Sequence, residues 1–176
     1  MTKTLEQRIQ ALEDQQAIIR LKAQYVNYND GGWEGGTHRY PAEVADMFVE
    51  DGVWDGRPNA GYAEGREEIR KLFESFAVVP FIVHYVTNPL IEVEGDAAVG
   101  HWHALVTSTM PPDGQGVWTL GIYKEHYVRT GQGWKFKSLR FVAAANTTYE
   151  LGWGKKQFAF GEQGFEQIAA TGARAR

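Results

Sequence analysis

The sequence predicts a single α+β domain, in which helices come first and an antiparallel sheet follows. Before Pro80, apolar residues recur at helical spacing, whereas residues 81–141 hold four β-rich runs separated by turns that contain Gly, Pro or Asp. A chain of 176 residues, 43% of them hydrophobic, is large enough to bury one core. We expect residues 1–150 to form this domain. Residues 151–176 are expected to be a tail, which either lies on the surface or packs as an arm on a partner subunit.

Residues 5–28 are predicted to form a long amphipathic helix. Its apolar positions recur at helical spacing and are Leu5, Ile9, Leu12, Ile19 and Val26. Gly31 and Gly32 follow, and glycine readily adopts the left-handed backbone found just beyond a helix end. Asp30 is therefore expected at the end of the helix and not on one of its regular faces.

Short elements are predicted between this helix and Pro80. Residues 33–40 are rich in glycine and form a candidate lid over a site, and Pro41 favours the start of a second helix. A short strand is expected around Trp54, followed by a turn and by a helix that begins near Glu64. These elements supply the helical cover for one face of the sheet.

Four long strands are predicted after Pro80, over residues 81–94, 97–109, 117–129 and a last run that ends at Phe141. Short turns join them, which favours an antiparallel meander of hairpins. Side chains alternate between the two faces of a strand, so His101 and His103 share one face. In the last run, the same alternation places Phe136 and Arg140 on a common face.

Composition limits the classes of partner and of chemistry. A formal net charge of -4 offers no basic surface for nucleic acid. With no cysteine, disulfides and thiolate chemistry are excluded. No apolar run is long enough to span a membrane, and the charged N-terminus is unlike a signal peptide. We expect a cytoplasmic protein that binds neither nucleic acid nor membranes.

Several segments together resemble a known family, over roughly residues 5 to 145. They are the helix end Tyr25-Val26-Asn27-Tyr28-Asn29-Asp30, the helix start Glu64-Gly65-Arg66-Glu67-Glu68-Ile69, the run His84-Tyr85-Val86-Thr87-Asn88-Pro89, and Gly133-Trp134-Lys135. In this order they resemble the SnoaL-like group of the nuclear transport factor 2-like superfamily. The resemblance implies a cone-shaped, barrel-like α+β roll whose N-terminal helices pack in a strongly curved antiparallel sheet. It also implies a homodimer or higher homo-oligomer.

The resemblance implies an acid-base site. In dehydratase and dehydrochlorinase members, an Asp from the first helix orients a His from the sheet, and Asp30 and His84 match those positions. Tyr25 matches a further site tyrosine five residues before the Asp. A polar residue on the next strand falls at His101 or His103, of which we prefer His103 as catalytic, and a late arginine falls near Arg140.

The predicted function is cofactor-independent proton abstraction by the His84 imidazole, in a dehydratase, isomerase or cyclase. Its ligand is expected to be a small hydrophobic, ring-bearing molecule. The residues expected to line the substrate pocket are Trp54, His101, Tyr123 and Phe136. No metal or cofactor is assigned to the site.

Two other readings compete with this one. In the first, His84, His101 and His103 bind Zn or Fe together with an acid such as Glu125. In the second, the domain is a non-catalytic binding or assembly module. Arg140 has a structural alternative too, an ion pair with Glu125 or Glu92. A hydrogen bond between Asp30 and His84 beside an open pocket would favour the enzyme.

Overall fold

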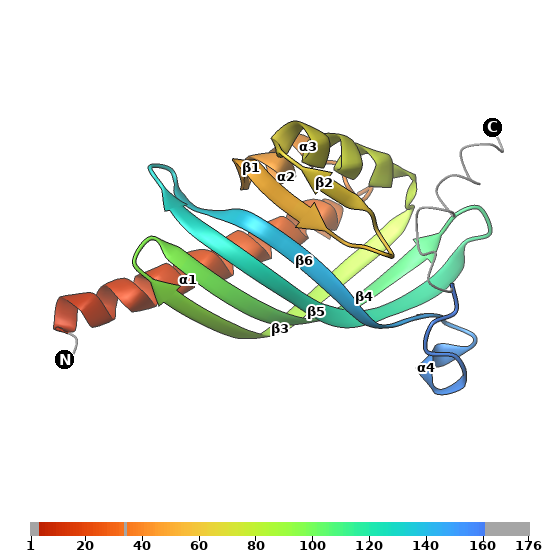
Figure 1. Ribbon diagram of the computed structural model, residues 1–176. Coiled ribbons are helices and arrows are strands. Elements are labelled where there is room, and N and C mark those ends of the chain that lie inside the picture. Colours follow the sequence, from red (N-terminus) through yellow and green to blue (C-terminus); the bar gives the residue numbers. More distant parts are fainter. Residues whose placement is uncertain (1–3, 34, 161–176) are drawn as a thin grey trace.

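The computed structural model describes residues 4–33 and 35–160, which form one strongly curved sheet with the helices of the first half of the chain on its concave side (Figure 1). The six strands are ordered β2-β1-β6-β5-β4-β3. Their bounds are β1 Phe48–Asp55, β2 Tyr62–Glu64, β3 Phe81–Glu94, β4 Ala97–Met110, β5 Gln115–Thr130 and β6 Gly133–Thr148. The helices are α1 Leu5–Asn29, α2 Pro41–Asp46, α3 Arg66–Ser75 and α4 Gly152–Lys155, with short 3-10 turns at Gly31–Trp33 and Phe76–Val78. The predicted α+β class is confirmed.

Helix α1 forms where it was predicted, but it buries a different face. Thr4 caps its start through a reciprocal pair of hydrogen bonds with Gln7. The buried positions are Asp14, Ile18, Lys22, Tyr25 and Asn29. Leu5, Ile9 and Leu12 are exposed, because the first turns of α1 project beyond the edge of the sheet (Figure 1). The inner face of α1 therefore carries polar groups into the domain interior.

The predicted meander is confirmed from β3 to β6. Each of these strands pairs antiparallel with its neighbour in sequence. Strand β6 continues to Thr148, past the predicted end at Phe141. This extension carries Asn146 alongside Thr119 of β5.

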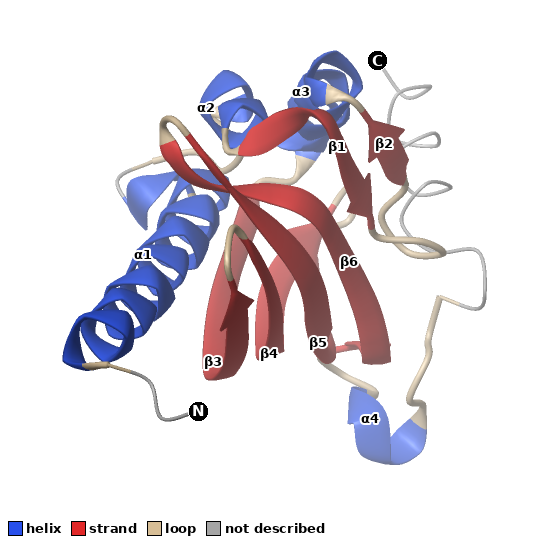
Figure 2. Cartoon of the chain, turned by 60° about the vertical axis from the view of Figure 1, so that its left-hand side comes forward, coloured by secondary structure: helices blue, strands red, loops and turns tan. Residues whose placement is uncertain are grey.

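The region between α1 and β3 closes one end of the cone (Figure 2). Strand β1 pairs in parallel with β6, and β2 pairs antiparallel with β1. Helices α2 and α3 contact each other, and α3 also contacts β1 and β2. Neither the β1–β6 pairing nor β2 was predicted, since contacts between distant segments leave no local pattern.

The chain beyond β6 turns back through α4 and meets the end of β6 again. The Asn146 amide donates to the Gln157 carbonyl, and the Ala159 amide donates to the Asn146 carbonyl. Residues 161–176 lie outside the described part of the chain, so the predicted arm remains a prediction. No described helix is long and apolar enough to cross a membrane.

Candidate active site

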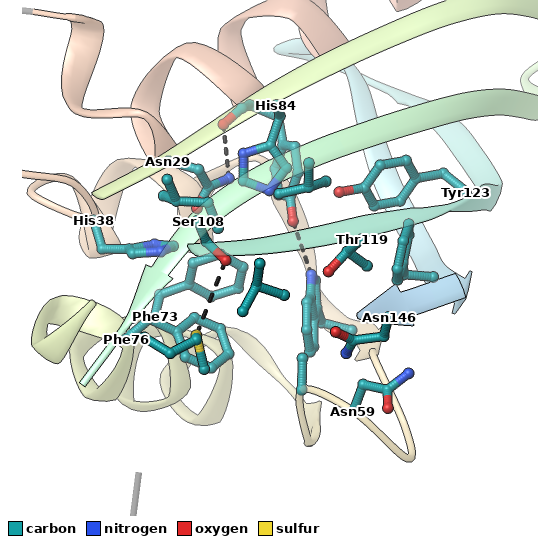
Figure 3. A pocket seen from close by; sticks show the side chains of 18 of the residues that line it. Asn29, His38, Asn59, Phe73, Phe76, His84, Ser108, Thr119, Tyr123 and Asn146 are labelled. Carbon is teal, nitrogen blue, oxygen red and sulfur yellow. Dashed lines mark hydrogen bonds between the residues drawn. The ribbon is translucent and has the colours of Figure 1, made fainter. Parts of the chain in front are cut away.

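A cavity of about 110 Å³ lies between the inner face of α1, helix α3 and the concave face of the sheet. Its wall is mostly apolar and aromatic, with a few polar groups (Figure 3). The polar or ionisable lining residues are Tyr25, Asn29, His38, Asn59, His84, Ser108, Thr119, Tyr123 and Asn146. No lysine or arginine is among the described residues that line it. An apolar pocket with a few convergent polar groups is the usual form of a small-molecule site.

Asp30 and His84 form a hydrogen-bonded pair at this cavity. The His84 Nδ1 atom lies 2.6 Å from Asp30 Oδ1, and the His84 backbone amide donates to Asp30 Oδ2 over 3.0 Å. A carboxylate only accepts hydrogen bonds, so it fixes the tautomer with hydrogen on Nδ1 and leaves Nε2 as a lone-pair acceptor. The Asp30 side chain is fully buried, while His84 is one of the lining residues. The pair can therefore present an oriented imidazole nitrogen to a ligand.

The end of α1 explains how Tyr25 and Asp30 both reach this region although they are five residues apart. Asp30 is the C-cap, and its amide donates to the carbonyls of Tyr28 and Val26 at the last turn. The chain leaves the regular helix there, which frees the Asp30 carboxylate from the helical spacing of about 100° per residue. Tyr25 lines the cavity, and Asp30 stands behind His84.

The Tyr25 hydroxyl is held by Trp54. The Trp54 indole Nε1 donates to this oxygen over 2.9 Å, which leaves the hydroxyl hydrogen available to another acceptor. Burial raises the pKa of Tyr25, so the phenol stays protonated at neutral pH. Trp54 lines the cavity, as expected from the sequence. Together they form a hydrogen-bond donor unit in the cavity wall.

Tyr123 also lines the cavity and lies in front of a buried ion pair. Lys22 Nζ is 3.3 Å from the centroid of the Tyr123 ring and 2.5 Å from Glu125 Oε1. The Tyr127 hydroxyl donates to Glu125 as well. Burial lowers the pKa of Lys22 to about 8, and the attraction of Glu125 opposes that shift. Neither Lys22 nor Glu125 lines the cavity.

The structure does not bring His101 or His103 to the cavity. Both side chains are exposed on the outer face of β4, where His103 Nδ1 is 3.2 Å from Asn88 Nδ2. The buried face of β4 instead carries Trp102 and the alternating residues after it, and Val106 pairs with His84. Both faces of β4 hold apolar residues, so alternation alone did not show which face points inward. A metal site that joins these histidines to the buried Glu125 is not formed, and no described group of three His, Asp or Glu residues is placed to hold a metal ion.

Phe136 and Arg140 do not share a face and do not line the cavity. Phe136 is fully buried, with its ring 5.0 Å from Phe48 and 5.5 Å from Tyr25. Arg140 is exposed on the outer face, opposite Lys124 of β5. A register shift between the β5–β6 pairs on either side of Lys137 inserts one residue and reverses the alternation. The suggested ion pair of Arg140 with Glu125 is not formed either, because Glu125 pairs with Lys22.

His38 is a lining residue that the sequence did not reveal. It belongs to the loop predicted as a candidate lid, and its side chain is buried near the rings of Phe73 and Phe76. Burial, followed by the proximity of His84, lowers the pKa of His38 to about 3. The only sequence feature that could have indicated a site role for His38 is its place in a glycine-rich loop, because loop residues show no periodicity.

Asn29 and Asn146 were likewise missed. The Asn29 side-chain Nδ2 donates to the Tyr25 backbone carbonyl over 2.8 Å, whereas Asn29 Oδ1 is buried without a partner among the described residues. Asn146 Oδ1 is also buried without a hydrogen-bond partner among the described residues. Asn146 lies beyond the predicted end of the last strand, so nothing local indicated that it would return to the cavity.

Comparison with solved structures shows the same fold in other proteins, two of which are named as enzymes. A hexachlorocyclohexane dehydrochlorinase, LinA type 2, superposes with a TM-score of 0.71 at 22% identity, covering 80% of this chain and 92% of its own. A provisionally named scytalone dehydratase from Novosphingobium aromaticivorans gives a TM-score of 0.69 at 25% identity, with coverages of 79% and 89%. A protein from the same organism, described as NTF2-like with a cystatin-like fold, superposes with a TM-score of 0.62 at 21% identity. The match covers 89% of this chain and 97% of that protein.

Sequence comparison gives the family directly. No functionally curated protein matches the chain significantly. The profile of the SnoaL-like domain, however, matches residues 10–140, which span most of α1 and almost the whole sheet up to the middle of β6. The chain therefore belongs to the SnoaL-like domain family of the nuclear transport factor 2-like superfamily.

Proposed function

We propose that this protein is a lyase or isomerase in which neutral His84 abstracts a proton from a small, hydrophobic, ring-bearing substrate. The observation that carries the proposal is the hydrogen bond of 2.6 Å between His84 Nδ1 and Asp30, at an open cavity. Structural neighbours named as a dehydrochlorinase and a dehydratase are compatible with this class of reaction. In this proposal the Asp30 and His84 side chains supply the base, and proton abstraction needs no cofactor.

In the dehydration that we favour, the substrate is a ring ketone with a hydroxyl group on the carbon β to the carbonyl. His84 Nε2 takes the proton from the α carbon, and that electron pair forms the new C=C bond. The C–O bond to the hydroxyl breaks, and the leaving oxygen takes the proton from the His84 imidazolium and departs as water, which restores the neutral base. The products are a conjugated enone and water.

Asp30 and Tyr25 complete this step in different ways. Asp30 holds the imidazole in the productive tautomer and stabilises the imidazolium that forms, as the acid does in a catalytic triad. Tyr25 accepts a hydrogen bond from Trp54 and donates its own hydrogen to the oxygen on which negative charge develops. Because Tyr25 remains protonated at neutral pH, it suits this role as a donor.

A non-catalytic role for the cavity is the alternative that the geometry favours less. A binding or assembly module needs neither an oriented imidazole nor a cavity beside it. Here the cavity is open, and the hydrogen bond of His84 to Asp30 directs its other ring nitrogen away from the carboxylate. A buried carboxylate that fixes a histidine tautomer is a feature of general-base sites.

The test is turnover of a panel of cyclic β-hydroxy ketones, followed by the ultraviolet absorbance of the enone. His84→Ala should lower the rate by about 100-fold to 10,000-fold, the usual range for the loss of a general base. The matched control is His101→Ala, which removes an exposed imidazole from the outer face of β4 and should leave the rate unchanged. Wild-type turnover that survives in His84→Ala would contradict the proposal.

A further inference from the structure

The loop between α1 and α2 holds His38 in a conformation that few residues adopt. Its φ is 52°, in the left-handed region that non-glycine residues rarely enter. The His38 amide donates to the Asn29 carbonyl over 2.9 Å, and the neighbouring Thr37 hydroxyl donates to the Val79 carbonyl over 2.7 Å. The loop is therefore tied both to the end of α1 and to the segment after α3. These ties direct an imidazole from a loop into the domain.

The surroundings of the His38 ring are aromatic, yet the ring is polar. The side chain is only 8% exposed, and its centroid is 5.4 Å from that of Phe76. Its Nδ1 atom is buried without a hydrogen-bond partner among the described residues. An unsatisfied buried nitrogen costs free energy that an apolar side chain in the same place would not. Packing alone therefore does not account for a histidine here.

Four of the polar side chains of the cavity lie at opposite edges of it. His38 lies toward one edge in Figure 3, and Thr119, Asn146 and Asn59 gather toward the opposite edge. Asn146 Oδ1, like His38 Nδ1, lacks a partner within the described residues. Ser108 and His84 also line the cavity, and the rest of its wall is mostly apolar and aromatic. A ligand that forms hydrogen bonds with these polar groups and contacts the apolar wall must then carry hydrogen-bonding substituents on an apolar frame.

The charge of the cavity restricts that ligand further. Burial and the nearby His84 keep His38 uncharged at neutral pH, since they hold the pKa of the imidazole at about 3. No cationic lysine or arginine is among the described lining residues. A carboxylate or a phosphate would therefore lose its hydration without gaining a cationic lysine or arginine partner among these residues. A neutral imidazole, with one donor and one acceptor nitrogen, matches a hydroxyl or a carbonyl group.

We propose that His38 is a specificity-determining residue of this site, which recognises a neutral hydroxyl or carbonyl substituent of the ligand by a hydrogen bond. The substrate is then an oxygen-bearing ring compound and not a halogenated hydrocarbon, which has no such group. This assignment rests on the proposed function, because it concerns the ligand that His84 would deprotonate. It adds a recognition role for a loop residue beside the dyad.

The test compares two probes of similar shape, phenol and toluene, whose substituents are a hydroxyl and a methyl group. Their dissociation constants are measured by calorimetry for the wild type, His38→Phe and His38→Asn. His38→Phe keeps an aromatic ring and removes the hydrogen bond. His38→Asn keeps donor and acceptor groups and tolerates a left-handed backbone. Circular dichroism verifies that each variant is folded.

His38→Phe should weaken phenol binding about 10-fold relative to toluene binding, the factor expected for the loss of one hydrogen bond. His38→Asn should keep much of the wild-type preference. An unchanged ratio of the two constants in His38→Phe would overturn the assignment. If His38→Phe does not fold, ¹⁵N shifts of the His38 ring in the wild type decide. They should change with phenol and not with toluene, and equal spectra with both probes would overturn the assignment.

The same probes separate this inference from the proposed function. His84→Ala removes the base but leaves His38 in place, so it should keep the dependence on His38 while it loses turnover. Turnover retained in His84→Ala would refute the dyad and leave the result on His38 standing. Conversely, loss of turnover in His84→Ala together with an unchanged binding ratio in His38→Phe would refute only the role of His38.

Discussion

Lys22 of helix α1 and Asp30 at its C-cap are buried charged residues that meet their partners in two different settings. Lys22 meets Glu125 of β5, and both side chains are almost completely buried and lie behind the cavity wall. Asp30 meets His84 of β3, and the histidine ring lines the cavity. The first pair is satisfied by protein groups alone, including the Tyr127 hydroxyl. The second pair leaves one imidazole nitrogen for a ligand.

This difference shows that burial of a charge does not by itself identify a functional site. Lys22 has a lowered pKa and is more completely buried than His84, yet it lies behind the Tyr123 ring and does not itself line the cavity. Buried ion pairs often add little net stability, because desolvation offsets their attraction. What distinguishes Asp30 and His84 is geometric: one partner is buried and fixed, and the other reaches open space. The experiments below ask whether the two pairs differ as this geometry requires.

The largest expected effect concerns the tautomer of His84. Asp30→Asn keeps an oxygen to accept the His84 amide but places an NH₂ group opposite His84 Nδ1, where the carboxylate accepted. The imidazole then carries its hydrogen on Nε2 and cannot act as a base toward the cavity. We expect turnover to fall by about 1,000-fold to 10,000-fold, as for a triad aspartate replaced by asparagine. Stopped-flow or steady-state kinetics on the β-hydroxy ketone panel measure the turnover rate. A decrease of less than 10-fold in Asp30→Asn would count against tautomer control.

The next effect concerns the other pair. Glu125→Ala leaves the Lys22 ammonium buried without its partner, which should lower the free energy of unfolding by about 3 to 5 kcal/mol. The double variant Lys22→Met with Glu125→Leu removes both charges and should lie much closer to the wild type. Urea unfolding followed by circular dichroism compares the three proteins. Equal losses in the single and double variants would mean that packing, and not the unpaired charge, dominates at this position.

The smallest effect returns to the cavity and concerns acid stability. The pKa of His38 is about 3 in the folded protein and near 6.5 in an unfolded chain, so the unfolded chain binds one more proton between these values. Stability should therefore fall as the pH drops from 6.5 toward 3, by up to about 1.4 kcal/mol per pH unit from this residue. Above pH 6.5 the contribution is constant.

His38→Asn has no titrating ring at this position and should show a shallower loss of stability in acid than the wild type. Urea unfolding at pH 7, 6, 5 and 4 measures the difference between the two proteins, which removes the contributions of other titrating groups. His101→Ala serves as the control for the loss of a histidine whose side chain is exposed on the outer face of β4. Parallel profiles for wild type and His38→Asn would show that His38 is protonated as readily in the folded state as in the unfolded one.

Local patterns predicted the elements that depend on neighbouring residues. The helix of residues 5–28 and the strand of residues 81–94 form almost where they were expected. The positions of Asp30 and His84 followed from the family resemblance, and the structure brings the two side chains within hydrogen-bond distance. The catalytic role of the pair remains a prediction that the variants above test. Tyr25, Trp54 and Tyr123 also line the cavity.

Sequence patterns did not predict which face of a strand points into the domain, because that depends on contacts between distant segments. Alternation correctly grouped His101 with His103, but only the position of α1 and β3 decides that this face of β4 is exposed. The inserted residue near Lys137 reversed the face of Arg140, and no local signal marks such a bulge. The role of the C-terminal tail and the oligomeric state are still predictions.

The sequence by itself determined the α+β class and the order of helix and meander, because these follow from hydrophobic period and turn chemistry. Only the tertiary structure decided which face of each strand encloses the cavity, and which loop and strand end return to it. His38 and Asn146 reach the cavity through contacts with segments far away in the chain. Such contacts depend on the packing of the whole domain, so no short stretch of residues encodes them.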